Sequence, residues 1–254
     1  MREAPIDKTL TIMEIVASAR RPLTVTEIST SAKLTIPTVH RLVGQLVERG
    51  LFKRHLTSKR VMPGVRLVTL GVESIQTSLY ADKPHALLKS LVVQIGEFAQ
   101  ISMVVDSELI CLDAAGVHRT LGLHLEQGNK APLHCTSIGK LYLSDLADDE
   151  FSTWLRAANL KPFTEHTIAN AAELRRHCQE IRARGWASCN EELNLGVVGC
   201  GVRLPLRNSS GFIGLCISAP AARMKHDTII GYVPTLRKFA KDITQAFEKQ
   251  SHAD

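Results

Sequence analysis

Two groups of side chains in the first quarter of the chain have chemistry that suits a nucleic acid. One group lies at helical spacing and consists of Thr38, His40, Arg41 and Gln45. Arg and Gln are common readers of base edges in the major groove of DNA, because each presents two hydrogen-bonding atoms to one base. The other group consists of Arg54, Lys59 and Arg60. Their charges suit contacts to phosphate, which position a protein but carry less sequence information.

The positive charge of the chain is concentrated around these residues. Residues 1–66 carry 12 Lys and Arg against five Asp and Glu, a net charge of +7, whereas the remaining residues sum to −1. A localised basic patch indicates a polyanionic partner, and we expect double-stranded DNA. The alternative is a solvated small domain or a protein-binding winged helix, which this concentration of charge disfavours.

Short helices are expected to position the base readers. A helix over residues 8–18 would bury a face made of Leu10, Met13, Val16 and Ala17. A second helix begins at Thr24, where residues 24–27 fit the capping-box pattern, and ends near residue 31.

A third helix carries the base readers themselves. Thr35 is a suitable N-cap and is counted with the DNA-binding residues, Pro37 is tolerated in the first turn, and Gly50 closes the helix. The apolar face of this helix consists of Val39, Leu42, Val43 and Leu46. The polar residues are therefore expected to face outward.

A basic hairpin and a linking helix should follow. Residues 51–55 and 59–62 flank the turn-forming residues 56–58, which predicts a wing with exposed basic side chains. Apolar spacing predicts a helix over 65–80, and two such helices could pair in a dimer. We expect a DNA-binding domain at 1–66, a linker helix at 67–81 and a second domain at 82–254.

The second domain has the pattern of an α+β fold. Helices are predicted at 84–96, directly after residues 134–140, at 171–184 and at 227–249, and strands at 100–105, 109–114, 186–190, 197–205 and 211–218. Such an order favours a mostly antiparallel sheet flanked by helices. The first residues do not resemble a signal peptide, and no apolar run reaches the roughly 18 residues of a membrane span. We expect a cytoplasmic protein without a membrane partner.

We expect that the protein is not an enzyme and that it binds neither a cofactor nor a metal. All six cysteines lie in the second part without a Cys-x-x-Cys pair, so they read as buried apolar side chains. His134 beside Cys135 suggests a ligand or nucleophile, but no converging set is evident, and His134 is expected to orient its loop. The glycines at 196–201 lead into a strand, which does not suit a phosphate loop. Glu191 and Glu192 should point to different faces, as solvated or dimer-contact residues.

Three motifs in order resemble the IclR family of bacterial transcriptional regulators, over nearly the whole chain. Residues 37–42 read Pro-Thr-Val-His-Arg-Leu, residues 131–140 read Ala-Pro-Leu-His-Cys-Thr-Ser-Ile-Gly-Lys, and Gly185-Trp186 precedes Asn-Glu-Glu-Leu-Asn-Leu-Gly-Val at 190–197. The resemblance implies a winged helix-turn-helix, a linker helix and a GAF-like effector-binding domain. It also implies homodimers or homotetramers that bind pseudo-palindromic promoter DNA as repressors or activators.

The resemblance further implies an effector pocket. Its positions correspond to Leu123, Ala131, Ser137, Ile138, Cys189, Val197, Cys216 and Ser218. The chain departs from the family at Ser137-Ile138, where very small residues are usual, at Cys189, where an acid is common, and at 61–64, where Val-Met-Pro-Gly replaces Tyr-x-Leu-Gly. We expect a reshaped, less charged pocket for a larger or aromatic acid in place of a small oxo-acid.

Donors for a carboxylate would come from Ser137, Ser218 and the backbone at the start of the helix after His134. Ser137 alternatively serves only in the first turn of that helix. We predict a ligand-responsive transcriptional regulator of a catabolic operon that senses a small organic acid. The alternatives are a thiol-based redox sensor using Cys135, Cys189 or Cys216, and a metal sensor.

Overall fold

The computed structural model describes residues 4–19, 21–55, 58–80, 83–105, 107–116, 130–206 and 211–250. The chain divides into two compact units, Met1–Ile75 and Gln76–Asp254. The boundary between them falls inside one helix, α4 (Val65–Tyr80). The division at residues 66/67 and 81/82 stays a prediction. Among the described residues, no helix is long and apolar enough to cross a membrane.

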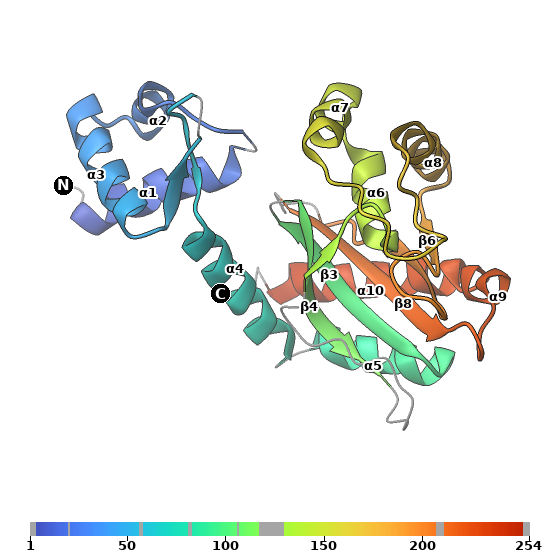
Figure 1. Ribbon diagram of the computed structural model, residues 1–254. Helices are drawn as coiled ribbons and strands as arrows, with labels where there is room; N and C mark the ends of the chain where they lie inside the picture. Colours follow the sequence, from blue (N-terminus) through green and yellow to red (C-terminus); the bar gives the residue numbers. More distant parts are fainter. Residues whose placement is uncertain are drawn as a thin grey trace. The chain divides into compact units, whose positions relative to one another are not determined.

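The first unit is a three-helix packet with a hairpin (Figure 1). Its elements are α1 (Pro5–Ser18), α2 (Val25–Ala32), α3 (Ile36–Glu48), β1 (Phe52–Arg54) and β2 (Val61–Pro63). The strands pair antiparallel, and Leu23 adds a bridge to Val61. The predicted capping box is confirmed: Thr24 Oγ1 accepts from Glu27 N at 3.2 Å, and Thr24 N donates to Glu27 Oε2 at 2.6 Å.

The buried face predicted for α1 is wrong in part. Ile12 and Val16 are buried there, whereas Leu10 is 48% exposed and Ala17 is also exposed. Apolar residues occupy more than one face of α1, so periodicity alone does not say which face packs against α2 and α3. In α3, by contrast, all four predicted apolar residues are buried.

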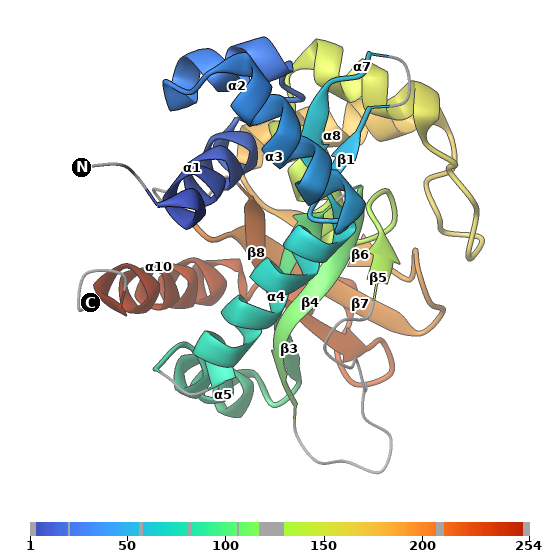
Figure 2. The same cartoon turned by 90° about the vertical axis from the view of Figure 1, so that its left-hand side faces the viewer.

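The second unit is built on a six-stranded antiparallel sheet in the order β5-β4-β3-β8-β7-β6. The strands are β3 (Phe98–Val105), β4 (Glu108–Ala115), β5 (Lys130–Pro132), β6 (Ala187–Asn190), β7 (Val197–Arg203) and β8 (Phe212–Pro220). Helices α5 (Lys83–Ile95) and α10 (Val233–Gln250) lie side by side against one face (Figure 2). Helix α6 (Ser137–Asp145) packs on the other face, next to α8 (Ala171–Arg184), with α7 (Asp148–Ala157) on the same side (Figure 1).

Three local features differ from the sequence prediction. The helix predicted at 227–249 is two helices, α9 (His226–Ile230) and α10, because Pro234 suits only the first turn of a helix. Strand β5 and helix α7 were not predicted. The strand has only three residues, which gives little periodic signal. The signal of α7 was missed, since Phe151, Trp154 and Leu155 recur at helical spacing and pack against the core.

Candidate DNA-binding surface and candidate effector cavity

Helix α3 separates its apolar and polar residues as predicted. Opposite its buried face, His40, Arg41 and Gln45 are exposed and Thr38 is half-buried. Thr35 is at the N-cap but makes no side-chain bond to a backbone donor; its Oγ1 lies 2.9 Å from Thr38 Oγ1. The surface therefore presents a guanidinium, an amide and an imidazole, which are groups that hydrogen-bond base edges and phosphates.

The hairpin carries basic side chains, but they differ in their contacts with the rest of the first unit. Arg60 Nη1 donates to the Pro22 carbonyl at 3.2 Å and lies 3.6 Å from Glu27 Oε2, so this side chain holds the hairpin to the start of α2. Arg54 Nη1 donates across the hairpin to the Lys59 carbonyl at 3.4 Å. The side chains of Arg54 and Lys59 are exposed.

The carboxylate of Glu27 ties this region together. Its pKa is lowered from 4.5 to about 2, chiefly by the hydrogen bond from the Thr24 backbone and then by Arg21, whose Nη1 lies 2.8 Å from Glu27 Oε1. Glu27 therefore stays ionised in the folded chain at any physiological pH, and its charge reduces that of the basic segment locally.

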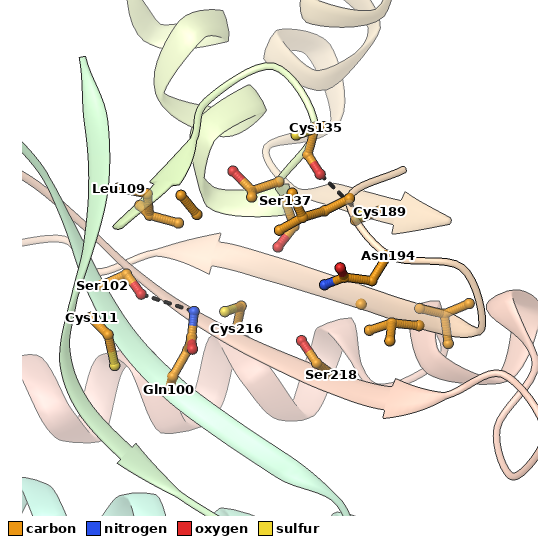
Figure 3. A pocket seen from close by; sticks show the side chains of 16 residues that line it. Gln100, Ser102, Leu109, Cys111, Cys135, Ser137, Cys189, Asn194, Cys216 and Ser218 are labelled. Carbon is orange, nitrogen blue, oxygen red and sulfur yellow. Dashed lines mark hydrogen bonds between the residues drawn. The ribbon is translucent and has the colours of Figure 1, made fainter. Parts of the chain in front are cut away.

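A cavity of about 300 Å³ lies between the sheet and the N-terminus of α6. We call it the α6 cavity. It is lined by Gln100, Ser102, Leu109, Cys111, Ala131, Cys135, Thr136, Ser137, Cys189, Leu193, Asn194, Val197, Val198, Gly199, Cys216 and Ser218 (Figure 3). The volume is at the lower end of the roughly 300–1,000 Å³ usual for ligand pockets. None of the described side chains that line it is charged.

Strand pairing explains why these residues meet. Gln100 lies opposite Cys216 across β3 and β8, and Gly199 of β7 lies opposite both Ser218 and Cys189. Directly paired residues of antiparallel strands point to the same face of a sheet. Gln100, Cys216, Ser218 and Cys189 therefore share the face below α6.

The N-cap residue and the first residue of α6, Thr136 and Ser137, line this cavity, and two backbone donors there have no acceptor within the helix. Thr136 is the N-cap, and its Oγ1 accepts from Gly139 N at 3.3 Å, while Lys140 N donates to the Thr136 carbonyl. In a helix the remaining N–H groups of the first turn lack intrahelical acceptors, which here leaves those of Ser137 and Ile138. An anion at this end is also favoured by the helix dipole.

The structure brings together six of the eight pocket positions that the family resemblance implied. Ala131, Ser137, Cys189, Val197, Cys216 and Ser218 all line the α6 cavity. Leu123 lies outside the described residues. The Ile138 side chain is fully buried in the core between α6 and the sheet and is not part of the cavity wall.

Two glycines receive the Ile138 side chain. A Cβ at Gly201 or at Gly214 would lie 2.5 Å from Ile138 Cδ1, far inside van der Waals contact. The large residue at position 138 is thus accommodated by missing side chains on β7 and β8, and its bulk fills space between α6 and the sheet.

Gln100 and Ser102 are two polar lining residues that were not predicted from the sequence. The signal was present, since both alternate with Ala99, Ile101 and Met103 along one strand, and polar residues at every second position mark a separate face. Both are buried, and Gln100 Nε2 donates to Ser102 Oγ at 3.1 Å. Asn194 and Leu193 were also missed, because they reach the cavity from a loop.

That loop, residues 191–196, is fixed to α6 by a buried ion pair. Lys140 Nζ donates to Glu192 Oε1, and both side chains are more than nine-tenths buried. The expectation that Glu192 is solvated or at a dimer contact is therefore wrong, because the loop folds back over α6. Thr167 Oγ1 also donates to the Glu192 carbonyl at 2.6 Å. These contacts hold Leu193 and Asn194 at the cavity.

Five of the six cysteines of the second unit are buried, and Cys189 is half-buried. Burial raises the pKa of Cys111, Cys135 and Cys200 to about 12 and that of Cys178 to about 11, and it also raises the pKa of Cys189 and Cys216. Reactive cysteines have lowered pKa values, so this environment does not favour redox sensing.

His134 has a structural partner. Its Nε2 donates to the Lys161 carbonyl at 3.0 Å, and the residue is buried. Within the described ranges, no group of three or more His, Cys, Asp or Glu side chains is placed to hold a metal ion.

A winged helix-turn-helix joined to an antiparallel-sheet domain with an internal cavity defines the class of ligand-binding transcriptional regulators. The family model for the bacterial transcriptional regulator IclR C-terminal matches residues 77–245, and the IclR helix-turn-helix domain matches residues 5–55. The chain therefore belongs to the IclR family of transcriptional regulators.

Similar proteins agree with this assignment. A Cupriavidus necator protein described as a probable transcriptional regulator, SauR, is 30% identical over 93% of this chain and 94% of its own length. The crystal structure of Thermotoga maritima IclR matches with a TM-score of 0.62 at 25% identity, covering 94% of this chain and 97% of that one. An IclR homologue of Microbacterium hydrocarbonoxydans, solved with 4-hydroxybenzoate, matches in fold with a TM-score of 0.59 at 18% identity, covering 97% and 100%.

Proposed function

We propose that this regulator controls a catabolic operon and responds to a small organic acid bound in the α6 cavity. It acts in the cytoplasm as a homodimer or tetramer on pseudo-palindromic promoter DNA. The observation that carries the proposal is the α6 cavity itself, which the first residues of a helix line and which no charged side chain of the described residues lines. Neutral donors and a helix N-terminus suit a monoanion, because they stabilise one negative charge without a fixed cation.

The walls of the cavity favour an acid with an apolar body. Leu109, Leu193, Val197 and the side chains of Cys111 and Cys216 offer apolar and polarisable surface. An aromatic ring would gain from burying its faces against such groups. The complex of the Microbacterium hydrocarbonoxydans homologue with 4-hydroxybenzoate supports an aromatic acid here as well.

DNA contacts are assigned to α3 and the hairpin. Thr38, His40, Arg41 and Gln45 would reach bases or adjacent phosphates, with Thr35, Arg54, Lys59 and Arg60 at the DNA backbone. Arg60 would act partly through position, since its guanidinium already holds the hairpin to Pro22. The effector changes promoter binding only if it favours one arrangement of the two DNA-binding units of a dimer over another.

The proposal is tested by calorimetric titration of the full chain with benzoate, 4-hydroxybenzoate, pyruvate and glyoxylate. A selective acid should also stabilise the protein against heat, by about 2.7 kcal/mol at 100 times its Kd. Fluorescence anisotropy with DNA from upstream of the protein's own gene should then change in affinity when that acid is added. A folded protein that binds none of the four acids would contradict the proposal.

A matched pair of variants locates the site. Ser137→Ala removes a hydroxyl at the cavity, whereas Ser144→Ala removes one on the same helix that bonds to the Leu141 carbonyl at 2.7 Å. Ser137→Ala should weaken acid binding and Ser144→Ala should not. Equal effects of the two variants would indicate that the acid binds elsewhere.

A further inference from the structure

One acceptor atom of a residue that lines the α6 cavity has no partner in the described part of the chain. Gln100 is 9% exposed, its Nε2 is engaged with Ser102, and its Oε1 is buried without a hydrogen-bond partner among the described residues. Figure 3 shows Gln100 and Ser102 together on the sheet, across the cavity from Ser137. A buried polar atom without a partner lowers stability, so its retention calls for an explanation.

The surroundings of Gln100 leave the cavity as the place from which a partner would come. Ser102 is fully buried, and the neighbouring side chain across the strand pair is Cys216, whose pKa is raised by burial and whose thiol is only a weak donor. Both residues line the cavity with Gln100. A ligand that carries a donor would therefore complete the hydrogen bonding of this amide.

A hydroxyl group is the chemistry that fits best. The Ser102 hydroxyl is able to donate or accept, so rotating the Gln100 amide would exchange which of its two polar atoms faces the cavity. A ligand hydroxyl also donates and accepts, and it satisfies the amide in both orientations. A keto or ether oxygen accepts only, and an ammonium donates only, so each fits one orientation.

We infer that the effector is a hydroxy acid whose carboxylate lies at the N-terminus of α6 and whose hydroxyl binds Gln100. This inference rests on the proposed function, since it presupposes an acid in the α6 cavity. It makes Gln100 the residue that determines specificity at the end of the ligand remote from the carboxylate. An acid without the hydroxyl would offer no donor to Gln100 Oε1 and would bind less tightly.

The test compares acids that differ by one hydroxyl, using the full chain and isothermal titration calorimetry. The probes are 4-hydroxybenzoate and 3-hydroxybenzoate against benzoate and 4-fluorobenzoate, and 4-hydroxybutanoate against butanoate. In one of these sets the hydroxy acid should bind at least about tenfold more tightly than its partner without the hydroxyl. This comparison uses only the unmodified protein and does not depend on any variant folding.

Two variants identify the side chain that binds the hydroxyl of the ligand. Gln100→Met keeps the length of the side chain but removes the amide; it should remove the tenfold preference and leave binding of the acid without a hydroxyl within about twofold. Ser218→Ala, on β8 but on the same face of the sheet, should keep the preference even where it weakens binding of both acids of a set. Gln100→Met also removes the hydrogen bond to the buried Ser102, so circular dichroism of each variant without ligand must first confirm that it is folded.

The outcomes separate the two proposals. If acids bind but the hydroxyl makes no difference, or if Gln100→Met retains the preference, the role of Gln100 is wrong and the proposed function stands. If no acid in the set binds to the folded protein, both are wrong. If the unmodified protein and Ser218→Ala prefer the hydroxy acid and Gln100→Met does not, both the proposed function and the role of Gln100 are supported.

Discussion

Lys140 of α6 and Glu192 of the 191–196 loop form an ion pair that is almost completely buried. The partners are 52 residues apart in sequence, and Glu192 Oε2 has no further partner in the described part of the chain. Charges in such a place are stable only together, because each alone would lose its hydration without compensation. The pair therefore links the start of α6 to the loop that carries Asn194.

Breaking this pair should destabilise the second unit strongly. Lys140→Met leaves Glu192 buried without its partner, and we expect a loss of about 3–5 kcal/mol in the free energy of unfolding. Urea denaturation followed by tryptophan fluorescence measures it, since Trp154 and Trp186 both lie in this unit.

The double variant Lys140→Met with Glu192→Leu should recover much of that loss, because no unpaired charge remains. As a control, Arg176→Met breaks the exposed pair with Glu180, at 3.1 Å, and should change stability by less than about 1 kcal/mol. A buried-pair variant no less stable than this control would show that the pair contributes little.

The glycines beneath Ile138 should tolerate no side chain. Gly214→Ala places a Cβ 2.5 Å from Ile138 Cδ1, and overpacking of this kind costs about 1–3 kcal/mol. Combining it with Ile138→Ala should cost less than the sum of the two single changes, because the shortened side chain makes room. If urea denaturation followed by circular dichroism gave strictly additive losses for the changes at 138 and 214, it would argue against this packing.

Gly44 in α3 provides the contrasting case. A Cβ there meets nothing within 4 Å, so Gly44→Ala should stabilise the protein by about 0.5–1 kcal/mol.

Local signals in the sequence predicted most elements but not their partners. The capping box at Thr24 and the buried face of α3 depend on residues within one or two turns, and both are confirmed. The packed face of α1 and the position of Glu192 depend on which distant segment folds over them; the first prediction is wrong in part and the second is wrong. Gln100 shows the same limit, since its polarity within a strand was visible but its strand register opposite Cys216 was not.

The cysteines should react slowly in the folded chain at neutral pH. Alkylation needs the thiolate, and pKa values raised to about 11 or 12 in Cys111, Cys135, Cys178 and Cys200 make that form rarer than in an ordinary cysteine. Mass spectrometry after iodoacetamide at pH 7.5 should find the urea-unfolded chain modified much faster than the folded chain. One rapidly modified cysteine in the folded chain would instead support the thiol-sensor alternative.

Glu27 should remain ionised to unusually low pH. Its folded-state pKa of about 2 is below the ordinary 4.5, so its contribution to stability is complete above pH 4.5 and declines as the pH falls toward 2. NMR of the full chain labelled at glutamate carboxyl carbons should show this signal unchanged down to about pH 3, with Glu27→Gln providing the assignment. Titration near pH 4.5 would mean that the capping box does not hold the charge.

Arg41 is the exposed α3 residue best suited to reading a base. If its guanidinium makes a bidentate contact, Arg41→Ala should weaken promoter binding by about 1–3 kcal/mol and relax the preference at one base position. Lys59→Ala in the hairpin should instead weaken all sequences alike and reduce the salt slope by about one. Fluorescence anisotropy at several salt concentrations distinguishes the two, with Arg176→Ala in α8 as the unaffected control. Unchanged affinity and sequence preference in Arg41→Ala would remove Arg41 from the interface, because an exposed residue of α3 that contacted a base could not be truncated without loss.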